Sequence, residues 1–186
     1  YLGCEYDNQE IIEYLQSINA NFEEFEDELL FDKVSQLMED GKVIGWFNGA
    51  MEFGPRALGG RSIIGDPRNT SMQSLMNLKI KYRESFRPFA PSVLEEYVHS
   101  NFEISTKSPY MLFVAPLKKK LCMEMSEKEK KLFGIKKLNI PRSSLPAITH
   151  VDYSARIQTI SEKTNPRFYR MINAFRNKTG CPTVVN

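Results

Sequence analysis

Long apolar runs, paired cysteines and histidines are scarce in this sequence of 186 residues. No stretch approaches the roughly 18 consecutive apolar residues of a membrane span, and the first ten residues have neither the basic region nor the apolar core of a signal peptide. Cys4, Cys122 and Cys181 are scattered and form no C-x-x-C pair, which argues against a disulfide framework and fits a reducing compartment. His99 and His150 do not stand at metal-ligand spacing, so we expect no metal site in this chain. These absences predict a cytoplasmic protein without membrane contact.

What is present has the composition of a soluble globular domain. Hydrophobic residues make up 41% of the chain and charged residues 26%, values that are typical of such domains. The length is enough for one domain with a substantial core and is short for two. We therefore expect a single folded unit.

The net charge of +2 conceals a strong asymmetry along the chain. Residues 1–40 hold twelve acidic residues and one basic residue, Lys33, whereas residues 41–186 hold eleven acidic and 24 basic residues. One interpretation is an acidic helical face in solvent together with a lysine-rich loop. The other is a basic body that binds a polyanion or a phosphate ligand.

The lysine-rich part of the chain is predicted to be a surface insertion. Nine lysines lie between residues 101 and 140, in a mixed-charge segment where Leu121, Met125 and Leu132 follow helical spacing. An amphipathic insertion over residues 117–143 accounts for this pattern, with the lysine side chains in solvent.

The stretch from Gly45 to Pro91 has the composition of an anion-binding site. Its glycines permit close backbone approach and positive φ, and its arginines lie among Gly, Pro and Phe: Arg56, Arg61, Arg68, Arg83 and Arg87. A guanidinium group grips phosphate with two parallel hydrogen bonds, whereas a lysine supplies a point charge. Neither a P-loop motif nor a G-x-G-x-x-G motif is present, so the common nucleotide motifs give no support. The alternative is a glycine-rich packing hairpin with surface arginines.

Short β-branched or aromatic stretches alternate with helical periodicity, which predicts an α/β domain with a twisted mixed sheet flanked by helices. Helices are expected over 8–18, 26–40, 71–80, 95–101 and 166–178, and strands over 43–47, 62–65, 111–116, 156–160 and from 183. The side chains expected to face the core from the helices are Ile11, Ile12, Leu15, Ile18, Leu29, Leu30, Val34, Leu37, Met38, Phe168, Met171, Ile172 and Phe175. The aromatic residues expected in the core rather than against a base are Trp46, Phe47, Phe53, Phe86 and Phe89.

Several long motifs resemble one enzyme family. They are MEFGPRALGGRSIIGDPR, the stretch from Met76 to Val93 that contains KYRESFRPFAPSV, and the later pieces PAITHVD, ARIQT and PTVVN. Together they resemble the C-terminal domain of the NodU/CmcH-type O-carbamoyltransferases. The resemblance covers nearly the whole chain.

The resemblance implies a YrdC-like α/β fold for residues 41–186. Residues 1–40 would be an acidic helical segment leading from an N-terminal domain that is absent here, and the sequence would be truncated at its C-terminal end. In the family the YrdC-like domain uses ATP, with Mg²⁺, and carbamoyl phosphate to form carbamoyl-adenylate. The N-terminal domain, which holds iron, passes the carbamoyl group to an acceptor hydroxyl.

Motif position also implies the site residues. Arg56 and Arg87 would hold phosphate or carbamoyl oxygens, and Lys81 would lie at the reacting α-phosphate. Arg156 and Asn186 would hold the adenylate. Of these, Lys81, Arg56 and Arg87 are expected to be catalytic. Further candidates in the same motif are Glu52, Arg61 and Ser62.

The sequence also leaves a second functional class open, namely a nucleic-acid-binding module without catalytic activity. The basic body suits it. Against it, the arginines cluster in Gly/Pro loops, and no aromatic strand motif of the RNA-binding type is present. We therefore expect small phosphate substrates as partners and no nucleic acid.

Overall fold

The computed structural model describes residues 1–138 and 140–186. The α-helices are α1 (Asn8–Ser17), α2 (Asp27–Glu39), α3 (Met72–Leu75), α4 (Val98–Asn101), α5 (Glu127–Lys130), α6 (Ile135–Leu138) and α7 (Pro166–Thr179). The strands are β1 (Ile44–Phe47), β2 (Arg61–Ile64), β3 (Pro91–Leu94), β4 (Phe113–Pro116), β5 (Ser154–Ile160) and β6 (Thr183–Val185). The predicted α/β class is confirmed.

The main sheet is mixed and has the strand order β4-β5-β3-β6. Its two central strands, β3 and β5, run parallel, and each outer strand pairs antiparallel with its neighbour. Strands β1 and β2 form a separate antiparallel pair. A bridge between Gly65, just after β2, and Val185 joins this pair to β6. The loop between β1 and β2 contacts the residue after β6, since Nδ2 of Asn186 donates to the carbonyl of Ala57 at 3.4 Å.

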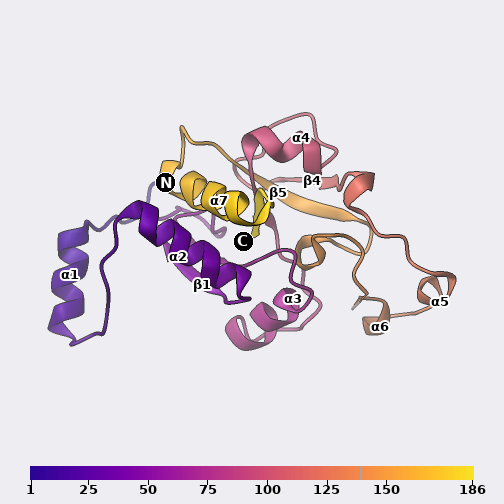
Figure 1. The fold of residues 1–186 in the computed structure, drawn as a ribbon, viewed down its shortest axis with the longest axis horizontal. Coiled ribbons are helices and arrows are strands. Elements are labelled where there is room, and N and C mark those ends of the chain that lie inside the picture. The colour runs from indigo at the N-terminus through magenta and orange to yellow at the C-terminus, as the bar shows by residue number, and fades with distance from the viewer. Residues whose placement is uncertain (139) are drawn as a thin grey trace.

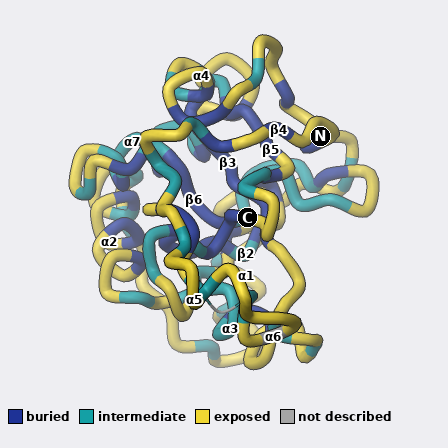
Figure 2. The backbone as a smooth tube through the Cα atoms, turned by 90° about the vertical axis from the view of Figure 1, so that its right-hand side faces the viewer, coloured by how far each residue is buried: buried dark blue, intermediate teal, exposed yellow. Residues whose placement is uncertain are grey.

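Helix α7 anchors the core. Its predicted inner face is confirmed, since Phe168, Met171, Ile172 and Phe175 are all fully buried. The helix ends at Gly180, whose φ of 76° is the left-handed conformation that glycine adopts without steric cost. Figure 2 shows that the buried backbone runs through β3 and β6.

Helix α2 packs beside α7 (Figure 1). Its buried residues are Phe31, Val34, Ser35 and Met38, at the i, i+3, i+4 and i+7 positions that share one helix face. The expected inner face was wrong for Leu29 and Leu37, which are exposed, and it omitted Phe31, which is fully buried. Phe31 packs close to the indole of Trp46, with ring centroids 6.2 Å apart, and this aromatic contact sets the rotation of the helix.

Ion pairs between α2 and α7 explain part of the charge asymmetry. Asp27 accepts from Arg167 at 2.7 Å and from Arg170 at 3.1 Å, and Asp32 accepts from Lys178 at 2.9 Å. These partly exposed pairs stabilise the fold modestly. They show that acidic side chains near the N-terminus neutralise basic ones of the last helix.

Helix α1 differs from expectation because it buries none of its residues. The side chains of Ile11 and Ile18 are exposed by 38% and 54%, although their spacing predicts one apolar face. Figure 1 shows α1 standing at one end of the molecule, away from the sheet. Its start is well formed, since Asp7 and Glu10 make a reciprocal capping box.

The lysine-rich insertion is not one amphipathic helix. Between Leu117 and Ser143 the described residues form short turns that include α5 and α6, and Asn139 lies outside the described residues. Leu121 and Met125 are only half-buried, and Leu132 is exposed. Lysine repulsion and the interruption at Gly134, with φ of 62°, oppose a continuous helix.

Three further differences concern the stretch between residues 43 and 94. Strand β3 was not expected, because Pro88 and Pro91 excluded a regular helix there and no strand pattern was recognised, yet all four of its residues are buried. The helix expected over 71–80 changes after α3 into a π-helical segment, η1 (Met76–Ile80). Of the aromatic residues expected in the core, only Trp46 and Phe89 are buried, and the exposed ones are Phe47, Phe53 and Phe86.

Among the described residues, no helix combines the length and the apolar character needed to cross a bilayer. The three cysteines carry free thiols.

Candidate anion-binding site

A cavity of about 280 Å³ opens where the loop between β1 and β2 meets the ends of the main sheet. Cationic side chains from four separate parts of the chain line it: Arg56, Arg61, Lys81, Arg83 and Arg156. Asn186 lines it as well, at the end of β6. The structure thus brings four of the five residues expected at the site to one cavity, and this cavity is the candidate anion-binding site.

The residues that follow η1 present Lys81 and Arg83. The amide of Asn77, which is fully buried, accepts a hydrogen bond from Nε of Arg83 at 2.6 Å. The same amide donates to the carbonyl oxygens of Ser85 at 3.1 Å and Arg87 at 2.8 Å. The guanidinium of Arg83 also lies over the ring of Phe89, 4.9 Å from its centroid. π-Helical turns are frequent at functional sites, and here the turn places Asn77 where it can hold the segment that carries two cations.

We expect Asn77→Ala to destabilise the protein by about 1–3 kcal/mol, because the fully buried amide of Asn77 no longer donates to the carbonyl oxygens of Ser85 and Arg87. Arg83 also loses its acceptor, so anion binding should weaken. Urea unfolding followed by the fluorescence of Trp46 measures the first effect, and calorimetric titration with pyrophosphate measures the second. Asn69→Ala, in the turn before α3, serves as the control for loss of a less buried asparagine. Equal unfolding free energies for the wild type and Asn77→Ala would contradict the prediction.

The positive charge of the cavity is poorly compensated. Within residues 1–138 and 140–186, Arg56, Lys81 and Arg156 have no carboxylate within ion-pair distance. Nε of Arg56 is buried without a hydrogen-bond partner. Burial, and to a lesser degree the charge of Arg56, lowers the pKa of Arg156. An arrangement of unpaired guanidinium groups is costly without an anion, and so it favours the binding of one.

Arg87 is placed differently from expectation. It does not line the cavity, and its half-exposed side chain pairs with Glu84 at 2.7 Å. Its backbone carbonyl is held by Asn77, and its side chain turns back to the carboxylate three residues earlier. The structure therefore does not bring Arg87 to the other candidate residues.

Arg83, which the sequence indicated as one of the loop arginines for anion contacts but which motif position did not assign to the site, lines the cavity. Burial, followed by the charge of Arg87, lowers the pKa of Arg83. The available signal was its position two residues after Lys81 in a segment interrupted by proline. Of the further candidates, Arg61 lines the cavity, whereas Glu52 and Ser62 support the loop from behind: the hydroxyl of Ser62 accepts from the backbone N–H of Gly59 at 2.9 Å.

A second cavity of about 390 Å³ adjoins the first. The two share the lining residues Pro88, Phe89, Ala90 and Arg156. The second is lined mostly by apolar side chains and has a polar end at His150 and Asp152. Asp152 accepts hydrogen bonds from the backbone N–H and the hydroxyl of Ser154. The bond from the hydroxyl is the largest cause of the lowered pKa of the Asp152 carboxyl. Together the cavities offer a cationic and a largely apolar compartment on either side of Arg156.

The described part of the chain has no group of three His, Cys, Asp or Glu side chains that could hold a metal ion. The cationic side chains of the candidate site present nitrogen donors, which suit oxyanions.

Comparison with known proteins shows the family to which the chain belongs. Residues 35–186 match the family model described as carbamoyltransferase C-terminus. The chain is 58% identical over its full length to an uncharacterized protein of Synechocystis, of which it covers 31%. It is 41% identical to nodulation protein NolNO of Sinorhizobium fredii, over 83% of the chain and 20% of that protein. It is 32% identical to the 3'-hydroxymethylcephem-O-carbamoyltransferase of Amycolatopsis lactamdurans, over 83% of the chain and 25% of that protein. The chain thus spans between a fifth and a third of these relatives.

Proposed function

The chain belongs to the carbamoyltransferase C-terminus family, and on this premise we propose that it binds ATP and carbamoyl phosphate and forms carbamoyl-adenylate. The carbamoyl group would then pass to an acceptor hydroxyl in another domain of the full-length enzyme. Mg²⁺ would arrive with the phosphates of ATP.

The observation that carries the proposal is the cluster of cations around one cavity, of which Arg56, Lys81 and Arg156 have no ion-pair partner among the described residues. ATP and carbamoyl phosphate are both polyanions, and joining them gathers several negative charges in one place. Arg56 and Arg156 can neutralise this negative charge, because neither has a carboxylate partner among the described residues. Preorganised cations of this kind stabilise the charge that develops during phosphoryl chemistry.

The proposed reaction forms a bond between a carbamate oxygen and the α-phosphorus of ATP and breaks the bond from that phosphorus to pyrophosphate. The carbamate comes from carbamoyl phosphate, with one water consumed and inorganic phosphate released. Lys81, on a mobile stem, would contact the reacting α-phosphate, and the guanidinium groups of Arg56 and Arg61 would hold the phosphate oxygens. The adjoining cavity, with its apolar lining, would receive the nucleoside.

Calorimetric titration with a non-hydrolysable ATP analogue, with pyrophosphate and with carbamoyl phosphate tests the proposal. We expect each to bind with a shallow dependence on salt, because few ionic contacts form. Absence of binding by all three ligands to the folded chain would contradict the proposed function.

A nucleic-acid-binding role predicts a different dependence on the basic insertion. Lys118, Lys119 and Lys120 lie in a shallow depression with His99 and Glu103, and none of them lines the arginine cavity. We expect the triple variant Lys118→Ala, Lys119→Ala, Lys120→Ala to bind pyrophosphate within about twofold of the wild type, because each exposed charge contributes roughly 0–1 kcal/mol.

The same triple variant is titrated with a single-stranded oligonucleotide over a range of salt concentrations. If the wild type binds the oligonucleotide with a steep log–log slope and the triple variant loses it, the nucleic-acid role is favoured. If neither binds, the small phosphate ligands remain as the partners.

A further inference from the structure

We propose that Glu52 is the positioning residue of the arginine loop, defined here as residues 52–61. Its carboxylate does not line the anion cavity; it lies behind the loop and fixes the backbone that carries Arg56 and the side chain of Arg61. The inference rests on the proposed function, because it assigns how that site acquires its geometry.

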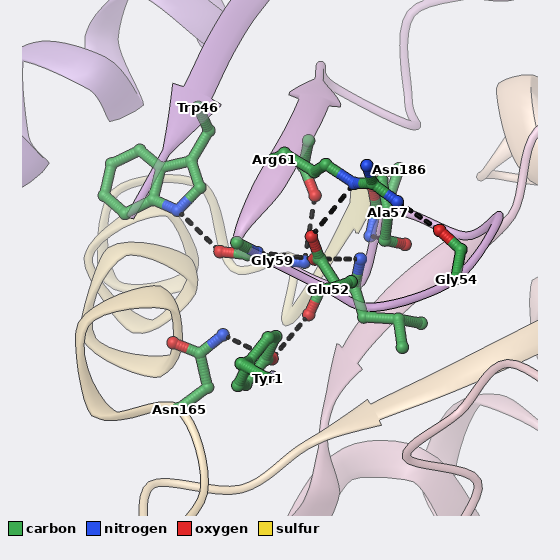
Figure 3. Close-up of polar contacts among 12 residues, drawn as sticks. Tyr1, Trp46, Glu52, Gly54, Ala57, Gly59, Arg61, Asn165 and Asn186 are labelled. Atoms are coloured by element: carbon green, nitrogen blue, oxygen red, sulfur yellow. Dashed lines mark hydrogen bonds and ion pairs between the residues drawn. The ribbon is translucent and has the colours of Figure 1, made fainter. Parts of the chain in front are cut away.

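The carboxylate of Glu52 forms the centre of a polar network (Figure 3). Its Oε1 accepts from the backbone N–H of Leu58 at 2.5 Å and from that of Gly60 at 2.7 Å. Its Oε2 lies 3.4 Å from Nε of Arg61, whose guanidinium also donates to the carbonyl of Gly54. The side chain of Glu52 therefore links the start of the loop to its end and orients the guanidinium of Arg61, which lines the cavity.

Other parts of the chain contact the carbonyl oxygens of the loop; that of Ala57 accepts from Nδ2 of Asn186 at 3.4 Å. The carbonyl of Leu58 accepts from Gln158 and from the hydroxyl of Tyr1, both at 2.8 Å. The indole of Trp46 donates to the carbonyl of Gly59 at 3.1 Å. These groups satisfy carbonyl oxygens, whereas the N–H groups of Leu58 and Gly60 depend on Glu52. Removal of its carboxylate would leave two backbone donors without their present acceptor.

The charge of Glu52 makes a structural role distinguishable from a positioning role. Its side chain is only 4% exposed, and a buried negative charge close to an anion site opposes anion binding by Coulomb repulsion. If the carboxylate were only a packing group, its neutralisation would tighten anion binding. If it positions Arg61, neutralisation will weaken binding, because an amide NH₂ facing Nε of Arg61 sets donor against donor.

The test compares Glu52→Gln, Glu52→Asp and wild type by calorimetric titration with pyrophosphate. We expect Glu52→Gln to weaken binding about tenfold or more, because Arg61 loses its ion-pair partner and the buried carboxylate is replaced by a group that opposes its guanidinium. Glu52→Asp keeps the charge on a shorter stem and should recover part of the affinity. Glu103→Gln removes an exposed carboxylate elsewhere and should bind within about twofold of wild type. Binding by Glu52→Gln that equals or exceeds wild type overturns the inference.

Hydrogen exchange of the wild type tests the network without a ligand or a variant. The amides of Leu58 and Gly60 should exchange slowly compared with those of Phe53 and Gly54, because only the first two donate to the buried carboxylate. Fast exchange at both in the folded protein overturns the inference even if Glu52→Gln does not fold. If the wild type shows protected amides but binds no pyrophosphate, the proposed function fails while the positioning of the loop stands.

Discussion

Replacing Arg56 by alanine is expected to weaken pyrophosphate binding to this chain by about a hundredfold. Arg56 lines the cavity, its Nε has no hydrogen-bond partner in the part of the chain that the structure describes, and burial has already removed that atom from water. A charge-assisted contact of this kind contributes roughly 2–4 kcal/mol, which corresponds to a loss of about a hundredfold. In a full-length enzyme, carbamoyl-phosphate-dependent exchange of ATP with pyrophosphate should fall by a similar or larger factor.

Arg87→Ala provides the contrast, because motif position and geometry disagree there. The motif expects Arg87 to act with Arg56, whereas its side chain pairs with Glu84 outside the cavity. We expect its removal to change pyrophosphate binding by less than about fivefold, as for an exposed ion pair. Equal losses for Arg56→Ala and Arg87→Ala would show that Arg87 turns into the cavity when the ligand binds. Unchanged binding by Arg56→Ala would contradict the assignment of the cavity.

Gly59→Ala is expected to destabilise the fold by about 2–5 kcal/mol. Gly59 has a φ of 103°, and an added Cβ would lie 2.4 Å from Cδ1 of Phe168 and 2.7 Å from the side-chain nitrogen of Asn165. The left-handed backbone costs a residue with a Cβ roughly 1–2 kcal/mol, and overpacking against a buried aromatic ring adds about 1–3 kcal/mol. Urea unfolding followed by Trp46 fluorescence measures the sum.

Gly54→Ala separates the two contributions. Gly54 also has a positive φ, 143°, but an added Cβ there meets nothing within 4 Å. We expect Gly54→Ala to lose only the backbone part, so that the difference between the two variants reports the clash with Phe168. Equal unfolding free energies for both variants would show that α7 gives way to the added methyl group.

The sequence predicted the elements whose pattern is local. Helix α7 carries an unbroken apolar face, an N-cap residue, Asn165, and a terminal glycine, so its bounds and its inner face were both predictable. Helix α1 carries as clear a pattern, yet its apolar face is exposed, because periodicity reports what a helix could bury and not whether a partner lies within the chain. Strand β3 shows the opposite failure: the prolines argued against a helix and no strand was expected, but Pro91 is the first residue of the strand, a position that proline tolerates.

The candidate site was predictable to the extent that residue type and spacing determine it. Arginines among glycine and proline indicated anion contacts. Arg56 and Arg156, which are 100 positions apart in the sequence, line the same cavity. The side-chain direction of Arg87 was not predictable, because it depends on the turn that Asn77 holds and on a carboxylate three residues away. The positioning role of Glu52 was not predictable either, because the sequence does not show which backbone N–H groups its carboxylate accepts from.

The pairing of β6 with β3 has a consequence for how the protein forms. Val184 pairs with Ser92, and Val185 bridges to Gly65, so the sheet joins residues separated by about half of the chain or more. Contacts of such long sequence separation close late, because the entropy of the intervening chain must be lost first. During synthesis, the β1–β2 hairpin that carries the arginine loop can fold early. The side of the cavity that Asn186 lines cannot form until residues 183–186 have left the ribosome. The cavity of the candidate anion-binding site should therefore form only in the cooperative step in which residues 183–186 join the sheet. A nascent chain arrested before that step should have no affinity for phosphate.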